Sequence, residues 1–478
     1  MDELLRRTAD LAVEFLASLP HRHVGATASI EELREALGGP LPERGEAPLE
    51  VIERLVRAAD PGLIGMPGPR YFGFVIGGHL PAALAADWLT STWDQNATLY
   101  ATAPANSVAE EAAAGWLLEV LDLPRAASVG FTTGCMMASF TALAAARHAV
   151  LARRGWDVEA RGLYGAPEID VVIGAEAHVT IHAALQMLGL GRERVKRVPT
   201  DDQGRMEAAA LRAVLEGCEG PLIVCAQAGN VNSGAFDPLD EIVTAVRERP
   251  QGDAWLHIDG AFGLWARASS TLAPLARGAE RADSWATDGH KWLNVPYDCG
   301  IVIVNDPESH RAAMTIAAPY LVQTGGHERD PFDYVPEFSR RARGFTVWAA
   351  LRSLGRQGAA DLVDRCCALA RRFADRLRGE PGIEILNDVV LNQVLVRFTS
   401  DERTREVIAR VQEDGTCWLG GTTWNGQAAM RISVSNWSTT EEDVDLSAEA
   451  ILRAARTLTL PTLSLPSPPA LPHRERKG

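Results

Sequence analysis

The lysine best placed to do chemistry is Lys291, which stands between a histidine and a tryptophan in Asp288-Gly-His-Lys-Trp292. The apolar run 300–304 follows it and predicts a strand. Burial beside a strand disfavours the ammonium form, lowers the pKa of the lysine and leaves an amine that can attack a carbonyl group. The alternative is a surface lysine whose alkyl chain lies along the protein. Other residues must decide between the two.

Three further features lie where strands are expected to end. The turn Thr132-Thr133-Gly134-Cys135 opens a predicted helix, where backbone N–H groups can hold an anion such as phosphate, although a plain glycine turn has the same composition. Asp259 ends an apolar run and could cap a helix or pair with a cation. His178 could stack on a planar ligand. With His182 it has the spacing of a metal pair, but no third ligand lies near it in sequence, so we expect no metal.

Together these features match the needs of one cofactor. Pyridoxal 5'-phosphate requires a lysine that forms a Schiff base, an acid paired with its pyridinium nitrogen, and an anion site for its phosphate. The 132–135 turn, His178, Asp259 and Lys291 supply this set and follow one another along the chain in this order. Each feature alone has a structural explanation, but the ordered combination predicts the cofactor.

The elements that must position these residues alternate between strands and helices. Short apolar runs predict strands at 170–174, 222–226, 255–259 and 300–304. Helical patterns fill 136–151, 181–188 and 239–247. This alternation predicts an α/β fold with a mostly parallel sheet flanked by helices. Ligands of such sheets bind at the carboxyl ends of the strands, where the candidate residues lie.

The length of 478 residues exceeds one ordinary core, so we expect several domains. Residues 1–85 read as a helical segment with a capping box from Ser29 to Glu32, and 86–343 as the cofactor-binding large domain. Residues 344–457 predict a smaller α+β domain, with helices in 346–377 and strands near 394–398 and 430–434. The proline-rich residues 458–478 predict a disordered tail.

Composition narrows the class of protein. A net charge of −15 argues against a nucleic-acid partner. No apolar stretch of about 20 residues is free of charge, and the N-terminus lacks the apolar core of a signal peptide, so we expect neither a membrane span nor export. Seven scattered cysteines favour free thiols in a reducing compartment, and the cytoplasm is the expected location.

Several motifs resemble those of group II pyridoxal-phosphate-dependent amino acid decarboxylases, which include aromatic-L-amino-acid and glutamate decarboxylases. They are Phe131-Thr-Thr-Gly-Cys135, Ala177-His178, residues 229–238, His257-Ile-Asp-Gly-Ala261 and Asp288–Trp292. The similarity runs from about residue 65 to 455 and is most specific in the order Asp, then His-Lys-Trp. It implies the fold-type-I aminotransferase-like fold and a homodimer with shared active sites.

The resemblance also implies roles for the residues. Lys291 forms the aldimine with the cofactor, Asp259 keeps the pyridine nitrogen protonated, His178 stacks on the ring and Ala261 packs against its other face. The phosphate is held by Thr133, Gly134, Cys135 and His290, with Asp288 nearby. The chain departs from the family at Met136, where a small hydroxyl residue is frequent, and at Asn230-Val231, where two threonines are usual.

The implied reaction is decarboxylation of an L-amino acid to the amine and carbon dioxide. In the family a tyrosine on a mobile loop returns the proton to the substrate carbon. The loop here is 323–338, and we favour Tyr334 over Tyr320 as that acid. Arg431 could bind a substrate carboxylate or serve the fold.

The prediction of the substrate rests on several aromatic side chains of the protein, and Arg70 is the main residue that argues against an aromatic substrate. Tyr71, Phe72, Trp93 and Trp424 could line a pocket for an aromatic amino acid, or belong to the core. Arg70 could instead read the second carboxylate of an acidic amino acid such as glutamate or aspartate. We favour an aromatic L-amino acid. An aldehyde synthase on the same fold is a further alternative, against which the loop tyrosine argues. A non-catalytic binding module is disfavoured by the intact Asp259, His290 and Lys291 set.

Overall fold

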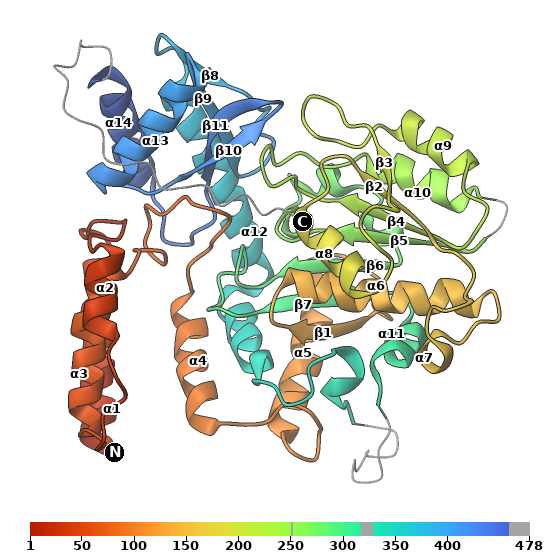
Figure 1. Ribbon diagram of the computed structural model, residues 1–478, viewed down its shortest axis with the longest axis horizontal. Coiled ribbons are helices and arrows are strands. Elements are labelled where there is room, and N and C mark those ends of the chain that lie inside the picture. Colours follow the sequence, from red (N-terminus) through yellow and green to blue (C-terminus); the bar gives the residue numbers. More distant parts are fainter. Residues whose placement is uncertain (250–251, 317–327, 458–478) are drawn as a thin grey trace.

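The computed structural model describes residues 1–249, 252–316 and 328–457 (Figure 1). A seven-stranded sheet forms its centre, in the order β1-β7-β6-β5-β4-β2-β3. The strands are β1 (Ser128–Thr132), β2 (Asp170–Gly174), β3 (Lys196–Val198), β4 (Leu222–Gln227), β5 (Ala254–Asp259), β6 (Ser284–Asp288) and β7 (Gly300–Val304). Only β7 runs against the others, since it is antiparallel to both β1 and β6. The predicted mostly parallel sheet is confirmed.

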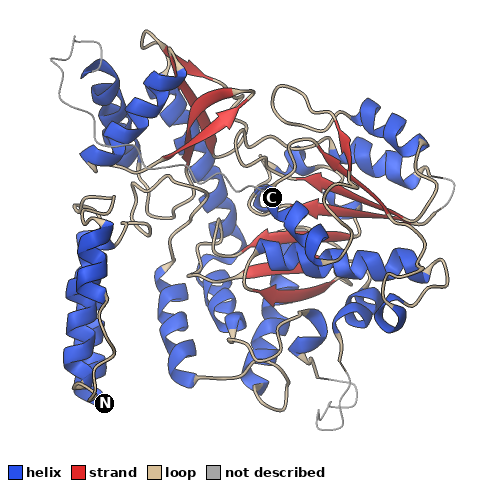
Figure 2. Cartoon of the chain, in the orientation of Figure 1, coloured by secondary structure: helices blue, strands red, loops and turns tan. Residues whose placement is uncertain are grey.

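Helices cover both faces of this sheet, because side chains alternate between the faces along each buried strand (Figure 2). In β4, Ile223 and Cys225 pack into a core with α6 (Cys135–Ala152) and α8 (Val179–Met187). Leu222, Val224 and Ala226 pack into the opposite core with three further helices of the large domain. These are α5 (Pro104–Val120), α9 (Ala208–Glu216) and α10 (Leu239–Arg247).

Helix α6 crosses under five strands and is the main support of the sheet. Within the described part of the chain it is the one helix long and apolar enough to cross a membrane by length and composition, and 67% of it is buried inside the protein. The edge strand β1 is also covered by α11 (Pro307–Met314) and η5 (Pro331–Tyr334), which contact each other. The other short elements are α7 (Val158–Arg161), η1 (Asp60–Gly62), η2 (Gly263–Ala268), η3 (Ala273–Ala276) and η4 (Ala279–Arg281).

A second, antiparallel sheet lies toward the C-terminus, in the order β10-β11-β9-β8. Its strands are β8 (Ile383–Ile385), β9 (Gln393–Phe398), β10 (Gly420–Trp424) and β11 (Gln427–Ser433). It packs against α13 (Asp401–Asp414), while α14 (Glu441–Thr457) packs on α13 and α12. Helix α12 (Arg343–Leu377) joins this unit to the large one and is interrupted at Gly355, whose φ of 63° is outside the helical region. The two helices predicted within 346–377 are therefore present, with the break between them at Gly355.

The N-terminal helices α1 (Asp2–Ser18), α2 (Ile30–Leu37) and α3 (Pro48–Ala59) stand beside α4 (Pro81–Trp93), as Figure 1 shows in red and orange. The predicted capping box is present, since Ser29 and Glu32 bond each other's backbone at the start of α2. None of these three helices has a buried residue, although each has an apolar face. Several of their apolar side chains are thus exposed, although α3 contacts both α1 and α2.

Candidate active site

Lys291 lies in the connection 289–299 between β6 and β7, two antiparallel strands. The N–H groups of Gly289 and His290 donate to the carbonyl of Cys299, at 3.0 and 3.3 Å, and so close this connection. The Nζ of Lys291 lies 3.0 Å from Oδ2 of Asp288, the last residue of β6. The lysine side chain is mostly buried, with 23% of it exposed. The alternative of a surface lysine is therefore wrong.

The charge state of this lysine differs from the expectation. Burial is the largest single influence on the pKa of Lys291 and lowers it, but the acidic groups around the amine, Asp288 first among them, together outweigh burial. The net pKa of Lys291 is therefore raised above its ordinary value, and the predicted lowering is wrong. The sequence could not show that Asp288 faces Lys291 within hydrogen-bond distance.

The start of α6 meets the same carboxylate. The N–H of Cys135 donates to Oδ1 of Asp288 at 2.6 Å, and Nε2 of His290 lies 3.4 Å from that oxygen. The N–H of Thr133 donates to Oε1 of Glu337 at 3.2 Å. A Cβ on Gly300 would come within 2.3 Å of the backbone of Gly134, so this close approach of β7 to the helix start requires a glycine. The predicted anion turn, Asp288 and His290 are thus together.

Asp259 ends β5, the strand between β4 and β6, and is buried. Its Oδ1 accepts the N–H of Ala261 at 3.2 Å and lies 3.6 Å from the sulfur of Cys135. Ala261 also supports the lysine strand, because its carbonyl accepts the N–H of Asp288 at 2.9 Å. The strand order therefore brings Asp259 and Asp288 to one end of the sheet, as the parallel pattern predicts.

His178 caps the start of α8. Its Nδ1 accepts the backbone N–H of Thr180 at 3.4 Å and lies 2.8 Å from that residue's hydroxyl, which leaves Nε2 to carry the proton. Burial lowers the pKa of His178, so the ring is neutral at neutral pH and suited to stacking. The charges of Asp259, Lys291, Arg431 and Asp288 act on the ring, and His178 lines the same small cavity as Asp259.

His290 is held as a neutral ring in the same way. Its Nδ1 accepts the N–H of Cys299 at 3.1 Å, and burial lowers its pKa. The ring of Tyr297 stacks on it with centroids 4.3 Å apart. Tyr297 is half-exposed, and the charge of Lys291 acts on its hydroxyl. Sequence reasoning missed Tyr297, although its place six residues after the lysine in the same connection could have suggested it.

The predicted substrate residues separate into different surroundings. Nε of Arg70 donates to the carbonyl of Thr416 at 2.6 Å, and its guanidinium lies 3.6 Å from Asp443. The side chain of Arg70 is thus already engaged by the C-terminal unit. Trp93 ends α4, half-exposed, with its ring edge-on to that of Phe345 at 5.0 Å. The structure brings neither residue into contact with the group around Lys291.

Tyr71 belongs to an aromatic stack. Its ring lies 5.1 Å from that of Trp418, nearly parallel, and Phe74 stacks on Trp418 at 6.0 Å. The charges of Tyr297 and Arg431 act on the hydroxyl of Tyr71, whose pKa burial raises to about 12. Phe74 is half-exposed. We call Tyr71, Phe74 and Trp418 the aromatic wall.

Of the other aromatic candidates, Phe72 packs edge-on against Phe373 and Trp424 joins the core beneath β10 and β11.

Arg431 of β11 faces this wall. Its Nη1 donates to the carbonyl of Val231 at 3.4 Å, and burial lowers its pKa. Among the described residues it forms no ion pair with a carboxylate. An unpaired guanidinium in this place is suited to a substrate carboxylate.

Tyr334 is in η5, beside β1, and its ring lies 5.5 Å from that of His310. The guanidinium carbon of Arg329 lies 4.2 Å from the ring centroid. Neither neighbour belongs to the group around Lys291. The rival Tyr320 and most of the first half of the 323–338 loop lie outside the described residues, as does the tail 458–478.

The assembled residues fit pyridoxal phosphate. Lys291 offers the amine, Asp259 a buried carboxylate for the pyridine nitrogen, His178 a neutral ring, and the start of α6 with His290 a place for the phosphate. No group of three or more His, Cys, Asp or Glu side chains within residues 1–249, 252–316 and 328–457 could hold a metal ion.

Comparison with known proteins agrees with this assignment. The pyridoxal-dependent decarboxylase conserved domain matches residues 31–399. An aromatic-L-amino-acid decarboxylase of Bacillus atrophaeus is 26% identical over 460 residues, covering 93% of each chain. An acidic amino acid decarboxylase of Homo sapiens is 29% identical, covering 74% of this chain and 68% of its own. The fold is similar to a crystal structure of Oryza sativa TDC with PLP and tryptamine, with a TM-score of 0.88, 23% identity and coverage of 96% and 98%. The chain therefore belongs to the pyridoxal-dependent decarboxylase family and is a carboxy-lyase of amino acids that uses pyridoxal 5'-phosphate.

Proposed function

We propose that this enzyme converts an aromatic L-amino acid to its amine and carbon dioxide. The observation that carries the proposal is the aromatic wall of Tyr71, Phe74 and Trp418, which offers a flat apolar surface near Arg431 and Tyr297. The sign against an aromatic substrate was Arg70, and its guanidinium is taken up by Asp443 and Thr416.

The chain's residues have separate tasks in this reaction. When bound, the cofactor supplies an electron sink for the bond that breaks at the substrate carbon. Lys291 would hold the cofactor through its side-chain amine. Asp259 would stabilise a proton on the pyridine nitrogen, because a buried carboxylate interacts strongly with a nearby positive charge. His178 would offer the cofactor ring a neutral imidazole to stack on.

The proton that replaces the carboxyl group comes from Tyr334 in this proposal. The cation of Arg329 over its ring would stabilise the phenolate that remains after proton transfer. Since the neighbours of Tyr334 in its own chain are Arg329 and His310, we assign it to the active site of a second subunit.

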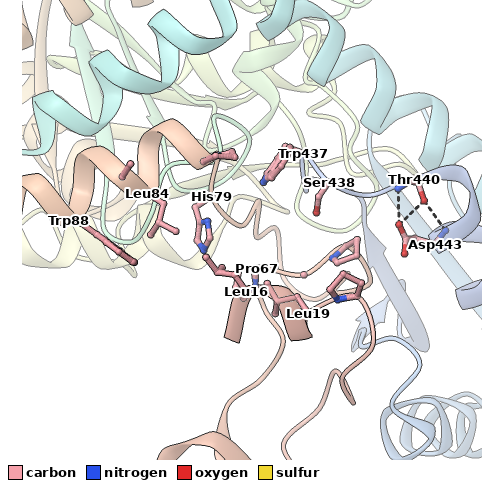
Figure 3. Close-up of a pocket in the computed structure, with 15 residues that line it drawn as sticks. Leu16, Leu19, Pro67, His79, Leu84, Trp88, Trp437, Ser438, Thr440 and Asp443 are labelled. Atoms are coloured by element: carbon pink, nitrogen blue, oxygen red, sulfur yellow. Dashed lines mark hydrogen bonds between the residues drawn. The ribbon is translucent and has the colours of Figure 1, made fainter. Parts of the chain in front are cut away.

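A homodimer is part of the proposal because α1, α2 and α3 leave apolar faces uncovered. Leu5, Val13, Val51 and Leu55 are between 44% and 59% exposed. Two cavities of about 600 Å³ each open here, one between the end of α1, α4 and residues 437–443, the other between α1, α3 and α4. Figure 3 shows Leu16, Leu19, Leu84, Trp88 and Trp437 around one of them. Lys291 does not line this cavity. A second copy of this chain would bury such a surface.

The dimer can be tested directly. Leu55→Glu places a charge in the uncovered face of α3 and is expected to shift sedimentation toward the monomer and to reduce activity as protein concentration falls. Glu50→Gln, on the same helix, serves as the control and leaves the assembly unchanged. A wild-type chain that sediments as a monomer at all concentrations contradicts this part of the proposal.

Arg431 favours a second candidate, an acidic amino acid. Its guanidinium could bind the side-chain carboxylate of glutamate or aspartate, since no carboxylate of the described chain neutralises it. An aldehyde synthase is the third candidate, and the presence of a tyrosine at 334 speaks against it.

A panel of aromatic, acidic and basic L-amino acids decides among these candidates. Carbon dioxide, amine and aldehyde are measured for each. We expect the highest kcat/KM for an aromatic substrate, with amine and carbon dioxide formed in equal amounts. A preference for glutamate or aspartate, or aldehyde in place of amine, overturns the proposal. We also propose a cytoplasmic location for the enzyme, because its seven cysteines are free, buried thiols.

A further inference from the structure

Two hydrogen-bond donors meet one oxygen of the carboxylate that faces the cofactor. Oδ1 of Asp259 accepts the N–H of Ala261 at 3.2 Å and lies 3.6 Å from the sulfur of Cys135. Ala261 follows Asp259 in its own chain segment, whereas Cys135 begins α6, 124 residues away in sequence. The Asp259 side chain is therefore held between two independent elements.

The thiol can act in this contact only as a donor. Burial raises the pKa of Cys135 well above its ordinary value, and the carboxylates of Asp259 and Asp288 raise it further. The proton thus stays on the sulfur, which donates to Oδ1 of Asp259. A carboxylate held by one backbone N–H can still turn about its Cβ–Cγ bond, but two donors from different directions fix its plane.

We propose that Cys135 is a positioning residue, whose thiol fixes Asp259 so that Oδ2 is the oxygen presented to the pyridine nitrogen of the cofactor. The proposal concerns how the cofactor is held, and it depends on the family's cofactor rather than on the choice of substrate. It also gives Cys135 a side-chain task that is separate from its backbone N–H, which donates to Asp288.

The chain offers a matched control in Cys225. This thiol is also fully buried, it lies on the neighbouring strand β4, and the charge of Asp259 acts on it as well. Between described residues, however, Cys225 has no hydrogen bond to Asp259. Cys225→Ala therefore removes a comparable volume and sulfur without removing the proposed donor.

The experiment compares the holoenzymes of Cys135→Ala, Cys135→Val, Cys135→Ser and Cys225→Ala. Each is diluted into a scavenger that traps free pyridoxal phosphate, and cofactor loss is followed by visible absorbance. Because a hydrogen bond to a charged group is lost, Cys135→Ala and Cys135→Val should lose cofactor about fivefold faster or more. Cys135→Ser restores a donor and should return toward the wild-type rate, and Cys225→Ala should match wild type.

A pH titration of the visible absorbance provides a second readout, since looser positioning of Asp259 changes the pH at which the bound cofactor's spectrum shifts. If the cavity left by Cys135→Ala harms folding, Cys135→Val still tests the proposal, because valine fills the volume of the thiol but cannot donate a hydrogen bond. The proposal is overturned if Cys135→Ser loses cofactor as fast as Cys135→Val, or if Cys225→Ala accelerates the loss equally. Neither outcome affects the substrate panel, so the two proposals fail separately.

Discussion

The ammonium group of Lys291 lies 3.0 Å from Oδ2 of Asp288, and this ion pair sets the charge of the reactive amine. The pair forms because Asp288 ends β6 and Lys291 lies three residues later, in the connection that leads into β7. Oδ1 of the same carboxylate accepts the first N–H of α6. Asp288 therefore connects the amine to the helix end at which we expect the phosphate.

Asp288→Asn should lower the pKa of Lys291. The amide keeps an acceptor for the N–H of Cys135 but removes the charge that favours the ammonium form, leaving burial to dominate. We expect the pH midpoint for imine formation between the cofactor-free protein and pyridoxal to fall by about one unit or more. Visible absorbance measures the imine, and Lys291→Ala gives the background because it should form none. An unchanged or higher midpoint would show that Asp288 does not control the amine.

Asp259→Asn should lower the decarboxylation rate by about 100-fold or more, because a neutral amide cannot hold the proton on the pyridine nitrogen. The variant and wild type must be compared at equal cofactor content, so each rate is divided by the amount of bound cofactor, which is measured after its release in alkali. Cys225→Ala, a neighbour without a hydrogen bond to Asp259 between the described residues, is the control. A variant that is fully loaded and retains its rate would contradict the role of Asp259.

Much of the large sheet could be predicted from the sequence because its strands are apolar and regular. The runs at 170–174 and 300–304 coincide with β2 and β7, and 239–247 with α10. We predict no strand at 284–288, yet these residues form the buried strand β6. Its Ser284 accepts the indole N–H of Trp255 at 2.8 Å from the neighbouring strand, so the cost of burying the hydroxyl is offset. Only the three-dimensional neighbour shows this compensation.

The substrate side was harder to predict because its partners lie far apart in sequence. Arg70 meets Asp443 and Thr416 of the C-terminal unit. Tyr71 meets Trp418. Periodicity carries information about an element's own faces but not about which distant element covers them. The same holds for Tyr297, whose stacking on His290 depends on the path of the connection. The domain boundaries at 85, 343 and 457 stay predictions.

Acid should destabilise the protein partly through His310. This ring is fully buried, with Nδ1 2.7 Å from the hydroxyl of Ser128 and Nε2 donating to the carbonyl of Tyr334 at 3.0 Å. Burial lowers the pKa of His310 to about 3, below its value of about 6.5 in the unfolded chain. Its contribution is therefore fully present above pH ~6.5 and is lost as the pH falls toward 3, since the unfolded chain then binds the extra proton.

His310→Gln removes this pH dependence. Between pH ~7 and ~5 the variant should lose about 2 kcal/mol less unfolding free energy than wild type, measured by urea unfolding at one fixed protein concentration. The variant is expected to be less stable at pH ~7, because glutamine replaces a buried, hydrogen-bonded ring. His21→Gln, at an exposed position, should leave the pH dependence as it is. Equal acid sensitivity of wild type and His310→Gln would assign the loss to other groups.

Tyr334→Phe removes the proposed proton donor and should lower amine formation by about 100-fold. If the donor serves the second subunit, mixed dimers of Tyr334→Phe and Lys291→Ala chains contain one complete site, with Lys291 from one chain and Tyr334 from the other. Random mixing of two inactive variants should then restore about a quarter of wild-type activity. If the two variants are denatured and refolded together and no activity returns, Tyr334 acts in the active site of its own chain or in neither active site. A mixture of Asp259→Asn and Lys291→Ala is the control, since both residues lie in the same chain's site at the ends of β5 and β6, and it should recover nothing.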